Sequence, residues 1–247
     1  MSGPALLRIG TAGWSVPRAV AENFPETGSG LERYAAVFNA AEINTTFYRS
    51  HKPGTYTRWA ASVPDGFKFS VKMPRAITHE RRLVDVADSV ATFLGDCRLL
   101  GDRLGPVLVQ LPPSLAFDLA VASAFLAMLR EHTDAPVALE PRHASWFEPD
   151  AEATLVTFKV ARVAADPAKV EAAGRSGGWP GLVYHRLHGS PRMYYSAYDE
   201  AALKDRATSL RASVVAGAET WCVFDNTASG AAAADALRLA ELLRIED

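Results

Sequence analysis

The feature that most constrains the fold is a regular alternation of short apolar runs with longer segments of helical periodicity. Side chains of a strand alternate between two faces, whereas those of a helix repeat every 3.6 residues, so the two patterns can be distinguished. Strands are expected at Leu6–Thr11, Ala41–Tyr48, Phe67–Met73, Val107–Leu111, Val137–Glu140, Val160–Ala165, Leu182–His188 and Trp221–Phe224. Helices are expected at Leu31–Phe38, Thr55–Ser62, Val84–Leu100, from the N-cap Asp118 to Glu131, and at Ala151–Phe158, Glu200–Ala216 and Ala231–Leu243.

Eight strands, nearly all followed by a helix, predict a parallel α/β arrangement. Eight such units in 247 residues predict a single (β/α)8 TIM-type barrel over residues 1–247. An open doubly wound sheet is the alternative. The first strand, however, is followed by Gly10–Gly13, which lacks the third glycine of a dinucleotide-binding fingerprint. The sixth unit is the weakest, because residues 166–180 are polar and glycine-rich and show no clear helical pattern.

Composition excludes several classes of protein. Lys and Arg number 26 against 28 Asp and Glu, so the net charge of −2 creates no global attraction to nucleic acid or anionic lipid. Cys97 and Cys222 are too far apart in sequence for a disulfide framework or a zinc site, and are expected in the core. The first ten residues do not resemble a signal peptide, and the most apolar stretch, Leu119–Met128, is too short to span a bilayer. The sequence therefore predicts a cytoplasmic protein without membrane association.

Polar side chains gather at the carboxyl ends of the predicted strands, where the active sites of TIM-type barrels lie. The alternation along each strand predicts which of them point into the barrel: Glu42, Asn44, Thr46, Ser70, Lys72, Gln110, Glu140, Arg142, Arg186 and His188. At the last strand, either Asp225 or Asn226 faces inward. Because ionised groups are rarely buried without partners, this ring predicts a small-molecule or nucleotide site at one mouth.

Seven segments carry a resemblance to a known family: IGTAGW at 9–14, AEINTTFY at 41–48, FKFSVKMPRAITH at 67–79, LVQLPP at 108–113, LEPRHASW at 139–146, YHRLHG at 184–189 and VFDNTASGAAAADA at 223–236. Their order and coverage resemble the YecE-like family, the domain of unknown function numbered seventy-two. The resemblance implies a TIM-type barrel and no particular activity. Ala12 stands where family members often carry Ser, and 16–24 lacks their second Trp and Tyr, so the first loop is expected to differ.

Four residues are the candidates for catalysis. Glu140 is a candidate acid or base beside Arg142 as an anion clamp, and a buried ion pair is the alternative. Lys72 is expected to bind a phosphate or carboxylate group, and a nucleophilic amine is the alternative. His143 is either a proton shuttle or a histidine bonded to backbone. Asp225 is a further carboxylate at the same mouth.

Ten residues are the candidates for substrate contacts: Trp14, Glu42, Asn44, Tyr48, His79, Gln110, Arg142, Arg186, His188 and Asn226. Trp14 and Tyr48 are expected to form aromatic walls. Histidines at 79, 143 and 188 could serve as metal ligands, but the sequence has no short-spaced histidine pair, and cations would crowd a metal. Metal and cofactor are therefore left unassigned.

The mixture of cations and carboxylates predicts an enzyme that uses acid/base chemistry on a small anionic substrate, such as a phosphorylated sugar or a nucleotide fragment. Lyase, isomerase and hydrolase chemistry all fit. One alternative is a metal-dependent enzyme that processes phosphodiesters or sugars. Another is a non-catalytic protein that binds nucleic acid or a metabolite, although the net charge does not support a nucleic-acid partner. The sequence makes no prediction about the oligomeric state.

Overall fold

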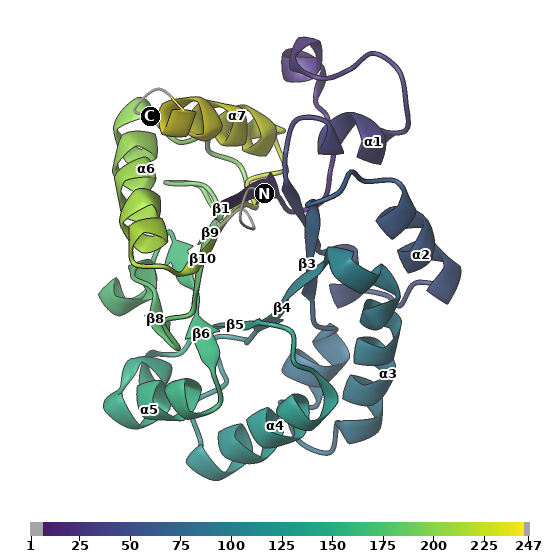
Figure 1. The fold of residues 1–247 in the computed structure, drawn as a ribbon. Coiled ribbons are helices and arrows are strands. Elements are labelled where there is room, and N and C mark those ends of the chain that lie inside the picture. The colour runs from purple at the N-terminus through teal and green to yellow at the C-terminus, as the bar shows by residue number, and fades with distance from the viewer. Residues whose placement is uncertain (1–6, 245–247) are drawn as a thin grey trace.

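Parallel strands occupy the centre of the molecule, and helices surround them (Figure 1). The computed structural model describes residues 7–244, so the first residue of the strand expected at Leu6–Thr11 lies outside the described residues. The strands are β1 Leu7–Thr11, β2 Ala40–Ile43, β3 Lys68–Lys72, β4 Leu104–Gln110, β5 Val137–Glu140, β6 Val160–Arg162, β7 Ala164–Asp166, β8 Gly177–Gly178, β9 Leu182–Leu187 and β10 Glu219–Phe224. The α-helices are α1 Gly30–Ala35, α2 Pro53–Ala61, α3 Ala87–Cys97, α4 Leu119–His132, α5 Pro149–Thr157, α6 Glu200–Val215 and α7 Ala231–Arg244.

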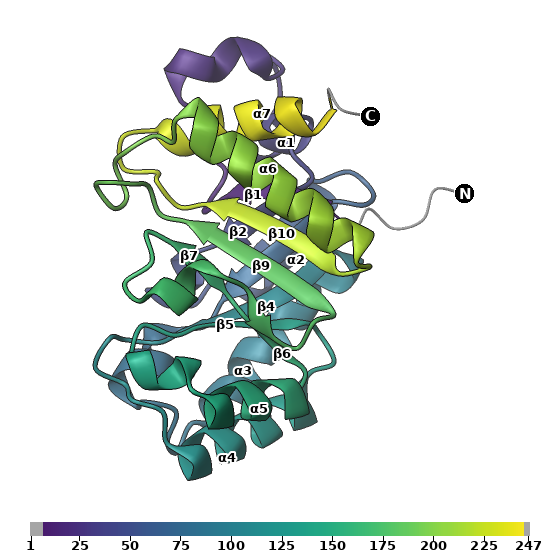
Figure 2. The same ribbon diagram turned by 90° about the vertical axis from the view of Figure 1, so that its left-hand side faces the viewer.

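Strand pairing follows the order of a TIM-type barrel. β2, β3, β4, β5 and β6 pair in parallel, and so do β1, β10, β9 and β7. β6 and β7 are two parts of one stretch interrupted at Val163, and the first part pairs with β5 while the second pairs with β9. On the other side, a bridge between Ala12 and Glu42 connects β1 to β2. The predicted α/β fold of the TIM type is therefore confirmed, with α6 and α7 covering β10 and β1 (Figure 2).

The β1–β2 contact depends on a close backbone approach. A Cβ atom on Gly10 would lie 2.0 Å from the carbonyl oxygen of Ala40. Beside it, the Tyr34 hydroxyl accepts a hydrogen bond from the Thr11 amide at 2.7 Å and donates to the Ala40 carbonyl at 3.0 Å. Glycine at position 10 is thus required for steric reasons, because any side chain would push the two strands apart.

The second strand is shorter than predicted. It ends at Ile43, and the chain turns into a 3-10 helix at Thr45–Phe47, so the expectation that the strand continues to Tyr48 is wrong. The Thr46 hydroxyl explains the turn, since it lies 2.8 Å from the Ile43 carbonyl and 2.7 Å from the Lys72 carbonyl. These bonds give the polar side chain backbone partners that a continuing strand would not offer.

Two other expectations need correction. The helix expected from Val84 begins only at α3, because Leu83 and Asp85 have positive φ angles of 71° and 53°. After Cys97 it continues as a 3-10 helix over Arg98–Arg103. The sixth unit contains a 3-10 helix at Glu171–Gly174 and β8, which pairs antiparallel to β6. Its glycine-rich sequence thus forms short irregular elements, as its lack of helical pattern suggested.

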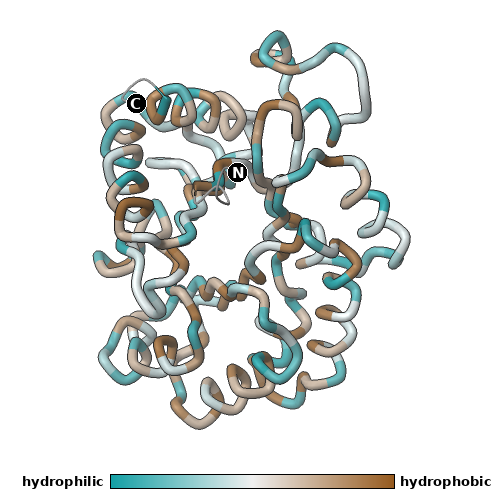
Figure 3. The backbone as a smooth tube through the Cα atoms, viewed as in Figure 1, coloured by the Kyte–Doolittle hydropathy of each residue, from teal (hydrophilic) through white to brown (hydrophobic). Residues whose placement is uncertain are grey.

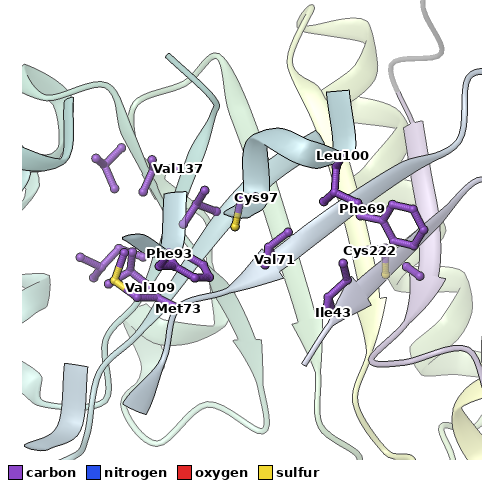
Figure 4. Close-up of a cluster of buried hydrophobic side chains, with 14 of the residues drawn as sticks. Ile43, Phe69, Val71, Met73, Phe93, Cys97, Leu100, Val109, Val137 and Cys222 are labelled. Atoms are coloured by element: carbon purple, nitrogen blue, oxygen red, sulfur yellow. The ribbon is translucent and has the colours of Figure 1, made fainter. Parts of the chain in front are cut away.

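Two sets of side chains form the interior. The outward faces of the strands pack under the helices, and there Val71 of β3 and Met73, which directly follows β3, belong to one cluster with Cys97 (Figure 4). Inside the barrel, Tyr184 stacks on Trp221 with ring centroids 6.0 Å apart and planes 8° apart. Both cysteines are buried free thiols, as predicted.

Hydrophilic and hydrophobic residues alternate along the surrounding helices (Figure 3). None of the helices within residues 7–244 is long and apolar enough to cross a bilayer.

Candidate active site

One buried guanidinium group, that of Arg186 at the carboxyl end of β9, connects three carboxylates inside the barrel. Its Nε donates to Glu42 Oε2 at 2.9 Å, and its Nη2 donates to Glu42 Oε1 at 2.8 Å. Nη1 donates to Glu140 Oε2 at 3.1 Å, and Nη2 lies 3.0 Å from Asp225 Oδ2. The alternation argument therefore placed these side chains correctly, and Asp225 is the residue that faces inward from the last strand.

A second set of polar contacts lies next to this guanidinium, toward the amino end of β9. The Tyr184 hydroxyl is 3.1 Å from Glu42 Oε2 and 3.0 Å from Ser70 Oγ. Burial and the charge of Glu42 raise the pKa of Tyr184 well above its ordinary value. The sequence analysis did not select Tyr184, although it has the same parity on its strand as Arg186 and therefore had to face inward.

His188, two residues after Arg186, lies between two of these carboxylates. Its Nδ1 is 2.9 Å from Asp225 Oδ2, and its Nε2 is 2.9 Å from Glu140 Oε1. Arg142 Nη2 reaches the same Glu140 oxygen at 2.5 Å and lies 3.1 Å from His188 Nε2. Four strand ends thus meet in one connected network, named here the mouth network, which consists of Glu42, Glu140, Arg142, Arg186, His188 and Asp225.

The charges of the mouth network favour the ionised form of Glu140 and Asp225. Burial alone would raise the pKa of Glu140, but His188, Arg142 and Arg186 outweigh it and hold this pKa well below the ordinary value. Burial opposes ionisation of Asp225 as well, and Arg186 again prevails and lowers its pKa. Both oxygens of Glu140 are also occupied by donors. A carboxylate in this state is a poor proton donor at neutral pH.

Lys72, at the end of β3, lies beside this network without joining it. Its Nζ stands 4.2 Å from the centroid of the Phe47 ring, and within residues 7–244 it forms no ion pair. Burial and the positive charge of Arg186 lower the pKa of Lys72 to about 8, although the nearby carboxylates oppose the shift. The amine is therefore a buried cation that can lose its proton close to neutral pH.

Three polar atoms that follow the ends of strands have no partner. They are Arg142 Nε, Asn44 Oδ1 and Asn226 Oδ1, which are buried and make no hydrogen bond. An unpaired buried donor or acceptor costs roughly 1–3 kcal/mol, so such atoms need an explanation. A ligand that accepts a hydrogen bond from Arg142 Nε would satisfy that donor.

His79 lies on the same side of the mouth as Lys72. Its ring packs edge-on against Phe47 with centroids 5.0 Å apart, and its Nδ1 is 2.9 Å from the Thr78 hydroxyl. Burial lowers the pKa of His79, and the charges of Lys72, Arg75 and Arg142 lower it further. The structure thus brings His79 close to Lys72 and Arg142, two other candidate residues of the sequence analysis.

His143 makes contacts with its own loop. Its Nδ1 accepts from the backbone N–H of Ser145 at 3.2 Å and lies 2.9 Å from the Ser145 hydroxyl. This caps the 3-10 helix Ala144–Phe147, which matches the alternative that His143 is bonded to backbone. No contact between His143 and the mouth network appears among the described residues.

The other candidate residues fall in three different places. Trp14 packs against Trp59 at 5.1 Å and against the outward-facing Phe69 at 6.1 Å, so its ring lies between the barrel and α2. Tyr48 is 70% exposed and touches Phe47. Gln110 is half-buried at the end of β4.

Asn226 connects the end of β10 to α7. Its Nδ2 donates to Asp235 Oδ2 at 2.7 Å and to the Ser196 carbonyl at 2.9 Å. The residue expected to contact substrate is thus bonded on its amide nitrogen to the following helix. A strand residue with the opposite parity to Asp225 points toward the surrounding helices, so this placement follows from the alternation.

Tyr194 is a mouth residue that the sequence analysis missed. Its ring packs edge-on against His188 with centroids 5.7 Å apart, and its amide donates to the His188 carbonyl. The residue has a φ of 70°, a strained conformation for a non-glycine residue. Burial and the charge of Asp225 raise its pKa. It lies on an irregular loop, where periodicity gives no signal.

The histidines and carboxylates of the mouth do not form a metal site. Within residues 7–244, no group of three or more His, Cys, Asp or Glu side chains is arranged to hold a metal ion. The reason lies in the mouth network, because both ring nitrogens of His188 face carboxylates and the carboxylate oxygens face arginines.

The family described as "Protein of unknown function DUF72" matches residues 8–247. This chain belongs to the DUF72 family. One DUF72 relative, the UPF0759 protein YecE of Escherichia coli K12, is 36% identical over 107 residues, which span 43% of this chain and 38% of YecE. The match thus spans well under two thirds of that relative. The UPF0759 protein YunF of Bacillus subtilis is 24% identical over 98% of this chain and 96% of YunF.

Solved structures agree with this assignment. A DUF72 protein from Thermotoga maritima has a TM-score of 0.79 at 25% identity, over 98% of this chain and 99% of that one. A DUF72 protein from Enterococcus faecalis also reaches 0.79, at 20% identity over 96% and 95% of the two chains. The 3-keto-D-glucoside 4-epimerase YcjR of Escherichia coli has a TM-score of 0.55 at 15% identity, over 96% of this chain and 98% of YcjR. The last two likenesses concern the fold alone.

In this DUF72 chain, the segments that carried the family resemblance also supply the mouth. Segments 41–48, 67–79, 139–146, 184–189 and 223–236 contribute, in this order, Glu42, Lys72, Glu140 with Arg142, Arg186 with His188, and Asp225. The resemblance and the geometry therefore point to the same part of the barrel.

Proposed function

We propose that this DUF72 protein is an enzyme that binds a small anionic substrate at the barrel mouth and transfers a proton through Lys72. The observation that carries the proposal is the buried Lys72 amine, which forms no ion pair within residues 7–244. Buried cations are normally paired. The missing partner of Lys72 is therefore the negative charge of a ligand.

The balance of charge at the mouth supports an anionic substrate. Each guanidinium nitrogen of Arg186 already contacts a carboxylate, so this residue has little left to offer a ligand. Arg142 uses Nη2 for Glu140 and leaves Nε unpaired. Arg142 and Lys72 are thus the two cations with donors available, which suits a phosphate or carboxylate group.

The pKa values support a division of roles. Glu140 and Asp225, both with lowered pKa values, hold Arg142, Arg186 and His188 in place. Lys72, with a pKa of about 8, exchanges a proton near neutral pH, as an efficient acid or base must. This assignment gives Glu140 a positioning role and makes Lys72 the group that reacts. A phosphorylated sugar or a nucleotide fragment fits the charge.

The proposal is tested by the effect of inorganic phosphate on the melting temperature. A ligand that binds only the folded state stabilises it by about 2.7 kcal/mol at a concentration one hundred times its Kd. We expect phosphate to raise the Tm of the wild type and to have little effect on Arg142→Met.

The matched control is Arg103→Met. Arg103 precedes the opposite end of β4 and pairs with Asp65 at 2.5 Å, so its loss should leave the phosphate response unchanged. Equal phosphate responses in Arg142→Met and Arg103→Met would reject the anion site.

A further inference from the structure

We infer that Lys72 is a nucleophile that forms a Schiff base with the carbonyl carbon of a small anionic aldehyde or ketone. The inference rests on the proposed function, because the same mouth must first hold the anionic group of the substrate. It goes beyond that function by naming the reacting bond and by restricting the substrate to carbonyl compounds.

The first argument is that Lys72 forms no ion pair within residues 7–244, although the carboxylates around it are all paired with other residues. Three buried carboxylates lie in the mouth network, yet all three contact arginine or histidine donors. A lysine present only to neutralise charge would contact one of them. Instead its Nζ lies over the Phe47 ring at 4.2 Å, and no side-chain donor within residues 7–244 is bonded to it and would occupy its lone pair in the neutral form.

The second argument is that the backbone of Lys72 is held rigidly. Lys72 pairs with Leu108 of β4, and the next amide, that of Met73, donates to the Leu108 carbonyl at 2.8 Å. On its other side, the Thr46 hydroxyl lies 2.7 Å from the Lys72 carbonyl. A nucleophile on a strand end that is bonded on both sides presents its amine in a defined position, as covalent catalysis requires.

The third argument is that the amine has a neutral form to react with. The charged and titratable groups that face Lys72 are Arg186, Glu42, Glu140, Asp225 and His79. Burial and Arg186 lower its pKa to about 8, against the effect of the three carboxylates. Roughly a tenth of the amine is then unprotonated at pH 7, whereas an ordinary lysine, with a pKa of about 10.4, is almost entirely protonated there.

The fourth argument concerns the anionic part of the substrate. Lys72 and Arg142 both lower the pKa of His79, so both cations lie near this residue. Arg142 Nε is buried and unpaired. An acid group bound there would direct the adjoining carbonyl carbon toward the amine, which favours a short 2-oxo acid or a phosphorylated aldehyde.

The reaction balances without a further reactant. The lone pair of the neutral Lys72 Nζ forms a bond to the carbonyl carbon, and the π electrons of the carbonyl bond move to its oxygen. The nitrogen loses a proton and the oxygen gains one, which gives a carbinolamine. The nitrogen lone pair then forms the C=N bond as the C–O bond breaks, and the oxygen takes the second proton that the nitrogen gives up, so that one water leaves and a neutral C=N bond remains on Lys72.

The test is reductive trapping with pyruvate and sodium cyanoborohydride, followed by intact-mass measurement and peptide mapping. Reduction of the C=N bond gives a stable adduct that adds the mass of pyruvic acid less one oxygen atom. We expect the adduct on Lys72 and not on the other five lysines, with a rate that rises as the pH increases through about 8.

Two variants and a neutral probe sharpen the test. Lys72→Arg keeps the positive charge but cannot form the adduct. Lys68→Arg is the matched control, because Lys68 begins the same strand and donates to the Asp102 carbonyl at 2.6 Å. Acetone carries the carbonyl without the acid group and should label Lys72 at least tenfold more slowly than pyruvate.

The outcomes separate this inference from the proposed function. Adduct spread evenly over the lysines, or equal labelling of Lys72→Arg and Lys68→Arg, would overturn the inference. If phosphate still stabilises the wild type through Arg142, the proposed function stands without it. Peptide mapping of the wild type decides the site even if Lys72→Arg does not fold. Equal rates with acetone and pyruvate would overturn the anionic substrate class.

Discussion

Replacing Glu140 by glutamine should destabilise the protein strongly. Glu140 is completely buried and accepts from Arg186 at 3.1 Å, from Arg142 at 2.5 Å and from His188 at 2.9 Å. Glutamine keeps the shape, but it removes the negative charge and places an NH2 group against one of these donors. Breaking a buried ion pair costs about 3–5 kcal/mol. In a domain of this size, 1 kcal/mol lowers the Tm by roughly 2–4 °C, so the expected loss is roughly 6–20 °C by calorimetry.

The matched control for this change is Glu80→Gln. Glu80 pairs with Arg75 at 3.1 Å, but both side chains are more than half exposed, so the loss should stay below about 1 kcal/mol. If Glu140→Gln melts within the range of this control, the mouth network is not a stabilising unit and the reasoning fails.

Titration gives an independent check of the same residue. The pKa of Glu140 is lowered on folding, so its contribution to stability is complete above the unfolded carboxyl pKa of about 4.3 and is lost as the pH falls toward the folded value. The difference in unfolding free energy between wild type and Glu140→Gln should therefore be constant at neutral pH and decrease in acid. A difference that grows below pH ~4 would contradict the assigned cause.

Two further predictions concern the β1–β2 contact. Tyr34→Phe leaves the buried Thr11 amide without its acceptor and should cost about 1–3 kcal/mol in denaturant unfolding; a change below ~0.5 kcal/mol would show that another group replaces the hydroxyl. Gly10→Ala places a Cβ atom 2.0 Å from the Ala40 carbonyl oxygen and should lower stability by at least ~1–3 kcal/mol; unchanged stability would mean that the two strands separate freely.

Much of the barrel and its mouth could be predicted because strand residues obey a strict period of two. That rule alone directed Glu42, Lys72, Glu140 and Arg186 into one lumen, and the structure places all four there. It also required Tyr184 to face inward, two residues before Arg186. Where the backbone is regular, the direction of a side chain follows from its position in the sequence.

The rest depended on contacts that have no period. Strand β2 ends early because the Thr46 hydroxyl finds backbone partners, and His143 turns toward its own loop for a similar reason. Trp14 follows a strand but packs outside the barrel against Trp59. Tyr194 lies on a loop with a strained backbone. Such placements are decided by single hydrogen bonds and local packing, which a hydrophobic pattern does not encode.

The contact between Arg186 and Glu42 joins residues 144 positions apart in the chain, and this has a consequence for how the protein is made. Strands β2 and β5 carry Glu42 and Glu140, whereas Arg186, which contacts both, is synthesised later. Until β9 arrives, Glu42 lacks its guanidinium partner and cannot leave water without a large desolvation cost. The charged lumen can therefore close only late in synthesis, after Arg186 is present and β10 has been made to pair with both β9 and β1.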